Sequence, residues 1–242
     1  TFGLMTAGAV AVGVLFESQP VRDTFGALML VATAVALGVS AVRRKAGVAG
    51  QRGNEERRSA RVAAMTGIDK DAQTFSDGPE FPAHLDLLAP LLGVVALVAG
   101  GIHAGDPAWL SVARVLIGAL FLGAISDAML LGHWYLVQPG LARGPLIELV
   151  WWSGLLWPFE LAVLLWPTGM VSVLNGTIAD GYNGMLGWFW VASTAFTIVL
   201  IVLTRVALKE RQYSAVMAAT GLLYLAILTA FGMDLVARAT LA

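Results

Sequence analysis

The apolar positions of the chain fall into seven long runs separated by polar stretches. A membrane-spanning helix needs about 20 apolar residues, whereas strands of a membrane barrel are alternating segments of about ten residues. The pattern therefore predicts an all-α integral membrane protein, a bundle of seven transmembrane helices forming one domain over residues 1–242. The first run is short, as expected of a span whose start is missing. The runs cover residues 1–16, 22–42, 84–104, 109–137, 144–166, 184–207 and 212–239.

Basic side chains gather in every second loop, and this alternation predicts the orientation. The loops 105–108 and 167–183 hold no Lys or Arg, and 17–22 holds only Arg22. We therefore expect a cytoplasmic N-terminus and an outer C-terminus, and the last six runs keep this orientation even if 1–16 is not a span. The basic residues of the other loops are Arg43, Arg44, Lys45, Arg52, Arg57, Arg58, Arg61 and Lys70, then Arg143, then Arg205, Lys209 and Arg211.

The predicted cytoplasmic loop, residues 43–83, is the one sizeable polar segment. Its first half contains NEERRSARVAAM, which is typical of a short basic surface helix, and its second half is acidic, with Asp69, Asp71, Asp77 and Glu80. One interpretation is a solvated linker. The other is a docking surface for a cytoplasmic partner or for lipid headgroups.

Composition narrows the classes of function. Of 242 residues, 58% are hydrophobic and 13% are charged, about half the charged share of soluble domains. The net charge of −1 gives no bulk attraction to nucleic acid. Because there is no cysteine, disulfides, thiolate chemistry and iron–sulfur ligation by this chain are excluded. The excess of arginine over lysine, with abundant alanine and glycine, favours a bacterial source and hence the inner membrane.

Ionisable side chains within the apolar runs are the candidate functional residues, because such groups are rare in spans. His133 and Glu148 lie equally far from the Gly140–Leu141 turn, roughly 11 Å along each helix. A carboxylate beside a neutral imidazole fixes its tautomer and raises its basicity. We therefore predict that His133 and Glu148 form a proton-exchanging pair near the cytoplasmic face.

The same region is a candidate quinone or haem site. A quinone needs an apolar cleft, an aromatic wall and a group that exchanges protons, and His133, Trp134, Tyr135, Glu148 and the deeper Asp127 supply these. A b-type haem needs two histidines at one depth. Of the three histidines, only His84 and His133 meet this condition. Because His84 lies at the predicted membrane boundary, just after Phe81 and Pro82, a haem is the less favoured cofactor.

Charges near the predicted outer face form a candidate structural cluster. Asp234 and Arg238 are four residues apart, the spacing of a helical ion pair. Arg114 is expected to reach toward Glu160. Pro158 removes a backbone donor just before Glu160, and a bend of the fifth run is expected there.

The sequence favours a membrane subunit of a larger electron-transfer or energy-converting complex, with other membrane subunits as partners. One alternative is a small proton-coupled transporter or channel using Asp127, Glu148 and Glu160. The other is a structural or assembly subunit. A rhodopsin is excluded because the last run, 212–239, has no lysine for retinal. The sequence also contains neither the HExxH motif of zinc proteases nor the GxSxG motif of the nucleophile elbow.

Overall fold

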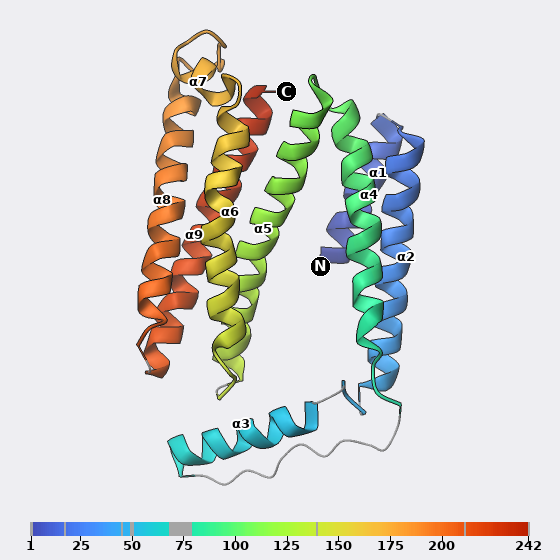
Figure 1. Ribbon diagram of the computed structural model, residues 1–242, viewed down its shortest axis with the longest axis vertical. Helices are drawn as coiled ribbons and strands as arrows, with labels where there is room; N and C mark the ends of the chain where they lie inside the picture. The colour runs from blue at the N-terminus through green and yellow to red at the C-terminus, as the bar shows by residue number, and fades with distance from the viewer. Residues whose placement is uncertain are drawn as a thin grey trace. The chain divides into compact units, whose positions relative to one another are not determined.

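The computed structural model describes residues 2–16, 18–44, 46–48, 51–67, 79–138, 140–210 and 212–241. These residues are almost entirely helical, and they contain no strand, only an isolated bridge between Val48 and Phe81. The predicted all-α class is confirmed. The elements are α1 (Phe2–Phe16), α2 (Pro20–Arg43), α3 (Gln51–Thr66), the 3-10 helix η1 (Ala83–Leu87), α4 (Leu88–His103), α5 (Ala108–Val137), α6 (Gly144–Leu165), α7 (Gly169–Leu174), α8 (Met185–Ala207) and α9 (Tyr213–Leu241) (Figure 1).

Six helical segments among the described residues are long and apolar enough to cross a membrane, which indicates a multi-pass membrane protein. Five are α2, α5, α6, α8 and α9, and the sixth joins η1 to α4. The expected seventh span, α1, is a helix of 15 residues. At 1.5 Å per residue this is roughly 22 Å, against about 30 Å for the bilayer core. The seven-span count and the orientation stay predictions.

The chain divides into two compact units, residues 1–104 and 105–242, and its description as one domain stays a prediction. In the first unit, α2 packs along α4, and α1 packs against α2. Gly93 of α4 permits the close approach, because a Cβ there would lie 3.0 Å from the sulfur of Met29 on α2. Small residues allow membrane helices to pack closely in this way.

The two ends of the 43–83 loop are joined within the first unit. The Arg43 guanidinium donates to the Glu80 carbonyl at 2.9 Å, and the Phe81 N–H donates to the Gly47 carbonyl at 2.8 Å. The end of α2 and the residues just before η1 therefore lie next to each other. Its basic half forms α3, as predicted. Its acidic residues Asp69, Asp71 and Asp77, like Lys45 and Lys70, lie outside the described residues.

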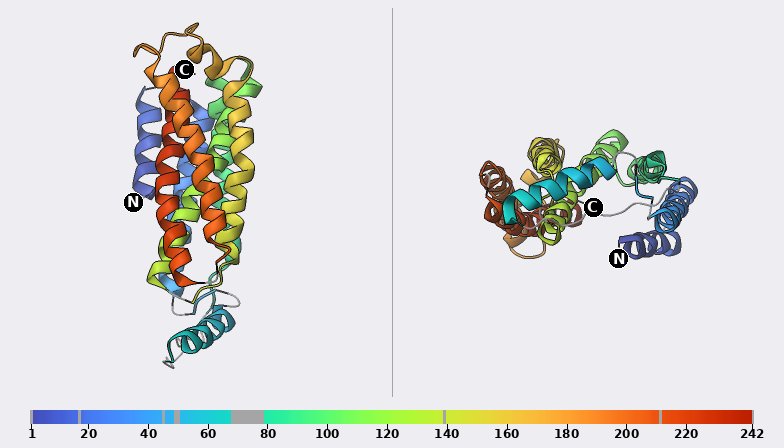
Figure 2. Two further views of the ribbon diagram at one scale, coloured as in Figure 1. Left: turned by 90° about the vertical axis from the view of Figure 1, so that its left-hand side faces the viewer. Right: turned by 90° about the horizontal axis from the view of Figure 1, so that it is seen from below.

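The second unit is a four-helix bundle in which α5, α6, α8 and α9 each pack against two neighbours, in the order α5–α6–α8–α9 and back to α5. Figure 2 shows these helices running side by side. Helices α6 and α9 are thus diagonal to each other across the interior. Side chains such as Phe121, Ile125 and Leu223 are fully buried there.

Several buried serine and threonine hydroxyl groups of the bundle bond to their own helices. Ser153 donates to the Leu149 carbonyl and Thr220 to the Val216 carbonyl, both at 2.8 Å. A hydroxyl bonded four residues back is satisfied without water, which is a requirement inside a bilayer.

Two loops with basic residues lie together at one end of the bundle. The Tyr135 hydroxyl donates to the Ala142 carbonyl across the α5–α6 turn, and the Tyr213 hydroxyl donates to the Leu136 carbonyl at 3.2 Å. The Arg143 guanidinium donates to the carbonyl of Gln212, in the α8–α9 loop, at 2.8 Å. We call this the His133 end of the bundle, since His133 lies one turn from it on α5.

The segment before α8 is organised by one carboxylate outside the spans. Asp180 accepts hydrogen bonds from the backbone N–H groups of Tyr182, Gly184 and Leu186, each at 2.9 Å. The Gly184 and Tyr182 N–H groups hold the pKa of the Asp180 carboxyl below its ordinary value. Because the pKa of Asp180 is lowered on folding, its carboxylate contributes its full stabilisation at pH values above its ordinary pKa. This stabilisation is lost as the pH falls through the lowered pKa of the folded chain.

Replacing Asp180 by alanine is therefore expected to loosen the start of α8 while the bundle stays folded. The measurement is amide hydrogen exchange at neutral pH, which should speed up at Tyr182, Gly184 and Leu186. Asp106→Ala, in another loop of this unit, is the matched control and should leave these amides unchanged. Equal exchange in both variants would contradict the assignment.

Candidate functional site

Four charged side chains gather near the end of the bundle opposite the His133 end. Arg114 comes from α5, Glu160 from α6, and Asp234 and Arg238 from α9. Each lies within two turns of the helix terminus at that end. We call these four residues the charge cluster.

The ion pair predicted from the four-residue spacing is present. The Nε of Arg238 lies 2.8 Å from each oxygen of the Asp234 carboxylate. A second nitrogen of the same guanidinium donates to the Arg114 carbonyl at 2.9 Å. Arg238 thus ties α9 to α5, and Asp234, only 7% exposed, has a cationic partner.

Arg114 does not bond to Glu160 as the sequence suggested. Its Nε donates to the Val163 carbonyl at 2.9 Å and another guanidinium nitrogen donates to the Trp166 carbonyl at 2.8 Å. The physical reason is that the last carbonyls of a helix have no partners within it, and they attract a cation. Arg114 therefore closes the end of α6.

Glu160 is the exceptional member of the charge cluster. Its side chain is fully buried, and no described group donates a hydrogen bond to either carboxyl oxygen. Asp234 and Arg238 are close enough for their charges to act on it. A buried polar group without a partner is costly. The chemistry open to the charge cluster therefore depends on whether the Glu160 carboxyl is ionised or protonated.

Gly118 of α5 makes room for the ion pair. A Cβ at this position would collide with the Arg238 guanidinium and would lie 3.1 Å from an Asp234 oxygen. The sequence alone did not reveal this role, because glycines are common in membrane helices and the side chain that faces Gly118 comes from another helix.

At the His133 end, the predicted pair between His133 and Glu148 does not form. No hydrogen bond or ion pair links them in the described residues, and both side chains are exposed. Instead, the Nδ1 of His133 lies 3.3 Å from the Tyr224 hydroxyl of α9, with the two rings edge to face. Equal depth did not determine which way the two side chains turn about their helix axes.

The other residues of the predicted quinone site separate into two kinds. Tyr135 is buried and bonds the Ala142 carbonyl, so it braces the turn. Trp134 is 52% exposed, as expected of a residue facing lipid or a partner. Asp127 is also exposed, without a hydrogen bond or ion pair in the described part of the chain.

The two histidines proposed for haem belong to different units. His84 is an exposed residue of η1 in the first unit, and His133 belongs to α5 in the second. The described residues contain no group of three His, Asp or Glu side chains that could hold a metal ion. A haem held by two histidines does not need a group of three such ligands, and the haem site stays a prediction.

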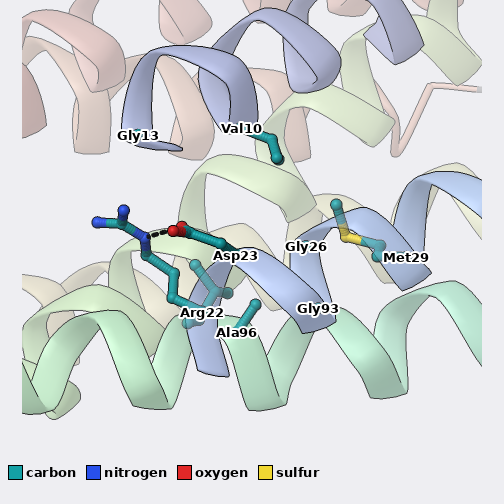
Figure 3. Close-up of a pocket in the computed structure, with 9 residues that line it drawn as sticks. Val10, Gly13, Arg22, Asp23, Gly26, Met29, Gly93 and Ala96 are labelled. Atoms are coloured by element: carbon teal, nitrogen blue, oxygen red, sulfur yellow. Dashed lines mark hydrogen bonds and ion pairs between the residues drawn. The ribbon is translucent and has the colours of Figure 1, made fainter. Parts of the chain in front are cut away.

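The first unit contains a cavity that sequence reasoning did not identify. It lies between α1, α2 and α4 and has a volume of about 350 Å³. Its mostly apolar lining includes Val10, Met29 and Gly93, and the ion-paired Arg22 and Asp23 line it as well (Figure 3). The glycines, spread over separate runs, were the available signal.

Comparison with known proteins gives no relative. No family model matches the sequence, and neither a search of curated proteins nor one of solved structures finds a similar chain.

Proposed function

We propose that the chain is a membrane-embedded subunit of a larger electron-transfer or energy-converting complex, and that it contacts a quinone at the His133 end of the second unit. The observation that carries this proposal is the exposed His133–Tyr224 pair. Its two polar groups lie 3.3 Å apart on neighbouring helices, within segments apolar enough to span a membrane. A quinone headgroup requires donors and a proton-exchanging group at such a place.

The chemistry of the pair suits this ligand. The neutral imidazole of His133 has one donor and one acceptor nitrogen, and the Tyr224 hydroxyl is both donor and acceptor. Trp134, next to His133 and also exposed, provides an aromatic wall. The polyisoprenoid tail of a quinone would lie along the apolar surface of α5 and α9.

The subunit assignment draws support from Asp127. An ionisable side chain in a span is expected to face protein or water rather than lipid, yet Asp127 is exposed on α5. A polar partner beside this face would resolve the conflict. Co-purification in mild detergent tests the assignment, and a chain that is always isolated alone would overturn it.

A proton-coupled transporter or channel is the second candidate, and the burial of Glu160 favours it. The other two carboxyl groups expected on a proton path, Asp127 and Glu148, are exposed. Glu148 and Glu160 are twelve residues apart on α6, or roughly 18 Å, so they do not share one site. If the chain is a purely structural subunit, changes at His133 and Glu160 are expected to alter stability but not quinone binding or proton transport.

The quinone contact is tested by binding of a short-chain alkyl benzoquinone to the purified full chain, followed by tryptophan fluorescence quenching. Tyr224→Phe removes one hydroxyl group, and the loss of about 1.4 kcal/mol is expected to weaken binding about tenfold. Tyr182→Phe, in the loop before α8, is the matched control and should bind as the unaltered chain does. Equal affinities in the two variants would refute quinone contact at this pair.

A further inference from the structure

The charge cluster holds a buried acid that the quinone proposal does not use. Glu160 points into the interior of the bundle from α6, and Asp234 approaches it from α9 on the diagonal. The carboxyl groups are both buried, with Glu160 at 0% and Asp234 at 7% exposure. Two neighbouring carboxylates cannot both stay ionised cheaply.

The donors of the charge cluster are assigned to other acceptors. Arg238 bonds Asp234 through Nε and the Arg114 carbonyl through another nitrogen. Arg114 bonds the carbonyls at the end of α6. Glu160 receives no hydrogen bond from any described group. Asp234 is thus compensated and Glu160 is not, although the two lie together.

We infer that Glu160 carries a proton and shares it with Asp234, so that the two carboxyl groups form a proton-binding site inside the membrane domain. A protonated Glu160 is neutral, which removes the cost of burying its charge. Its hydroxyl becomes a donor, and the nearest acidic acceptor is Asp234. The site then contains one ionised carboxylate, matched by Arg238, and one carboxylic acid.

The surroundings favour a proton over a metal cation. The titratable groups facing Glu160 are Asp234 and Arg238 from α9, with Arg114 nearby on α5. The adjacent α8 has its single charged residue, Arg205, at the His133 end, and α7 has none. Two guanidinium groups beside two carboxyl groups repel a metal ion. Because the Arg238 side chain is 35% exposed, the cluster reaches the surface of the second unit.

This inference is independent of quinone contact, because the two sites lie at opposite ends of the same bundle. It is tested by infrared spectroscopy of the full chain in phosphatidylcholine liposomes at neutral pH. We expect the carbonyl stretching band of a protonated carboxylic acid. The band should disappear in Glu160→Gln, which keeps size and neutrality, and should remain in Glu148→Gln, the matched control on the exposed side of α6.

Labelling of glutamate with carbon-13 in the otherwise unaltered protein keeps the test valid if Glu160→Gln does not fold. The acid band should then shift to lower frequency, and it should shift in the Glu148→Gln protein too. Absence of an acid band at neutral pH would overturn the inference, since Glu160 would be ionised. A band that survives Glu160→Gln, or that does not shift on labelling, would overturn it as well, because the proton would belong to another group.

Discussion

Replacing Arg238 by leucine is expected to lower the free energy of unfolding of the full chain by about 3 kcal/mol. The change leaves the buried Asp234 carboxylate without its cation, and the removal of one partner from a buried pair typically costs about 3–5 kcal/mol. We expect the lower value because the Arg238 side chain is 35% exposed. The bond from Arg238 to the Arg114 carbonyl is lost too. The measurement is unfolding of the purified protein in mixed micelles.

The control is Arg205→Leu, which removes an exposed arginine near the other end of the bundle. It should change the free energy of unfolding by less than about 1 kcal/mol. Similar losses in both variants would show that the ion pair does not stabilise the bundle.

A double variant distinguishes the cost of leaving Asp234 unpaired from the net contribution of the ion pair to stability. When Asp234 and Arg238 are both replaced by leucine, no uncompensated charge stays buried, so the double variant should be more stable than Arg238→Leu alone. If it is less stable, the two side chains contribute through packing against α5 rather than through their charges.

The helices were predictable because burial in lipid imposes a simple pattern on the sequence. The run 109–137 became α5, Ala108–Val137, and the run 184–207 became α8, Met185–Ala207. Backbone groups in a span must bond within their own helix, so length and apolarity decide the outcome locally. The first run, 1–16, is helical but short, and its pattern does not decide whether it spans.

Contacts within one helix were predictable in the same way, whereas contacts between helices were not. Asp234 and Arg238 are joined by helical periodicity alone. The partner of His133 was predicted from depth, which says nothing about rotation around the helix. Tyr224 lies on α9, which packs against α5 but is far from it in the sequence. Arg114 was expected to reach toward Glu160, although the carbonyl groups at the end of α6 were the acceptors that lacked partners.

Gly118 shows why the packing of the charge cluster was hidden in the sequence. It is buried on α5 against the Arg238 guanidinium, and a Cβ added there would lie 3.1 Å from an Asp234 oxygen. Gly123, five residues later on the same helix, has nothing within 4 Å of such a Cβ. The two glycines look alike in an apolar run, and only the neighbouring helix distinguishes them.

Alanine at these two positions is therefore expected to have opposite effects on the free energy of unfolding. Gly123→Ala should stabilise the chain by up to about 1 kcal/mol, because alanine is the better helix former. Gly118→Ala should destabilise it by about 1–3 kcal/mol, the usual cost of overpacking, since Arg238 must move away from Asp234. In an Arg238→Ala background this cost should largely disappear, because the coupling resides in that contact. A cost that persists there would mean that Gly118 serves the backbone of α5 and not the ion pair.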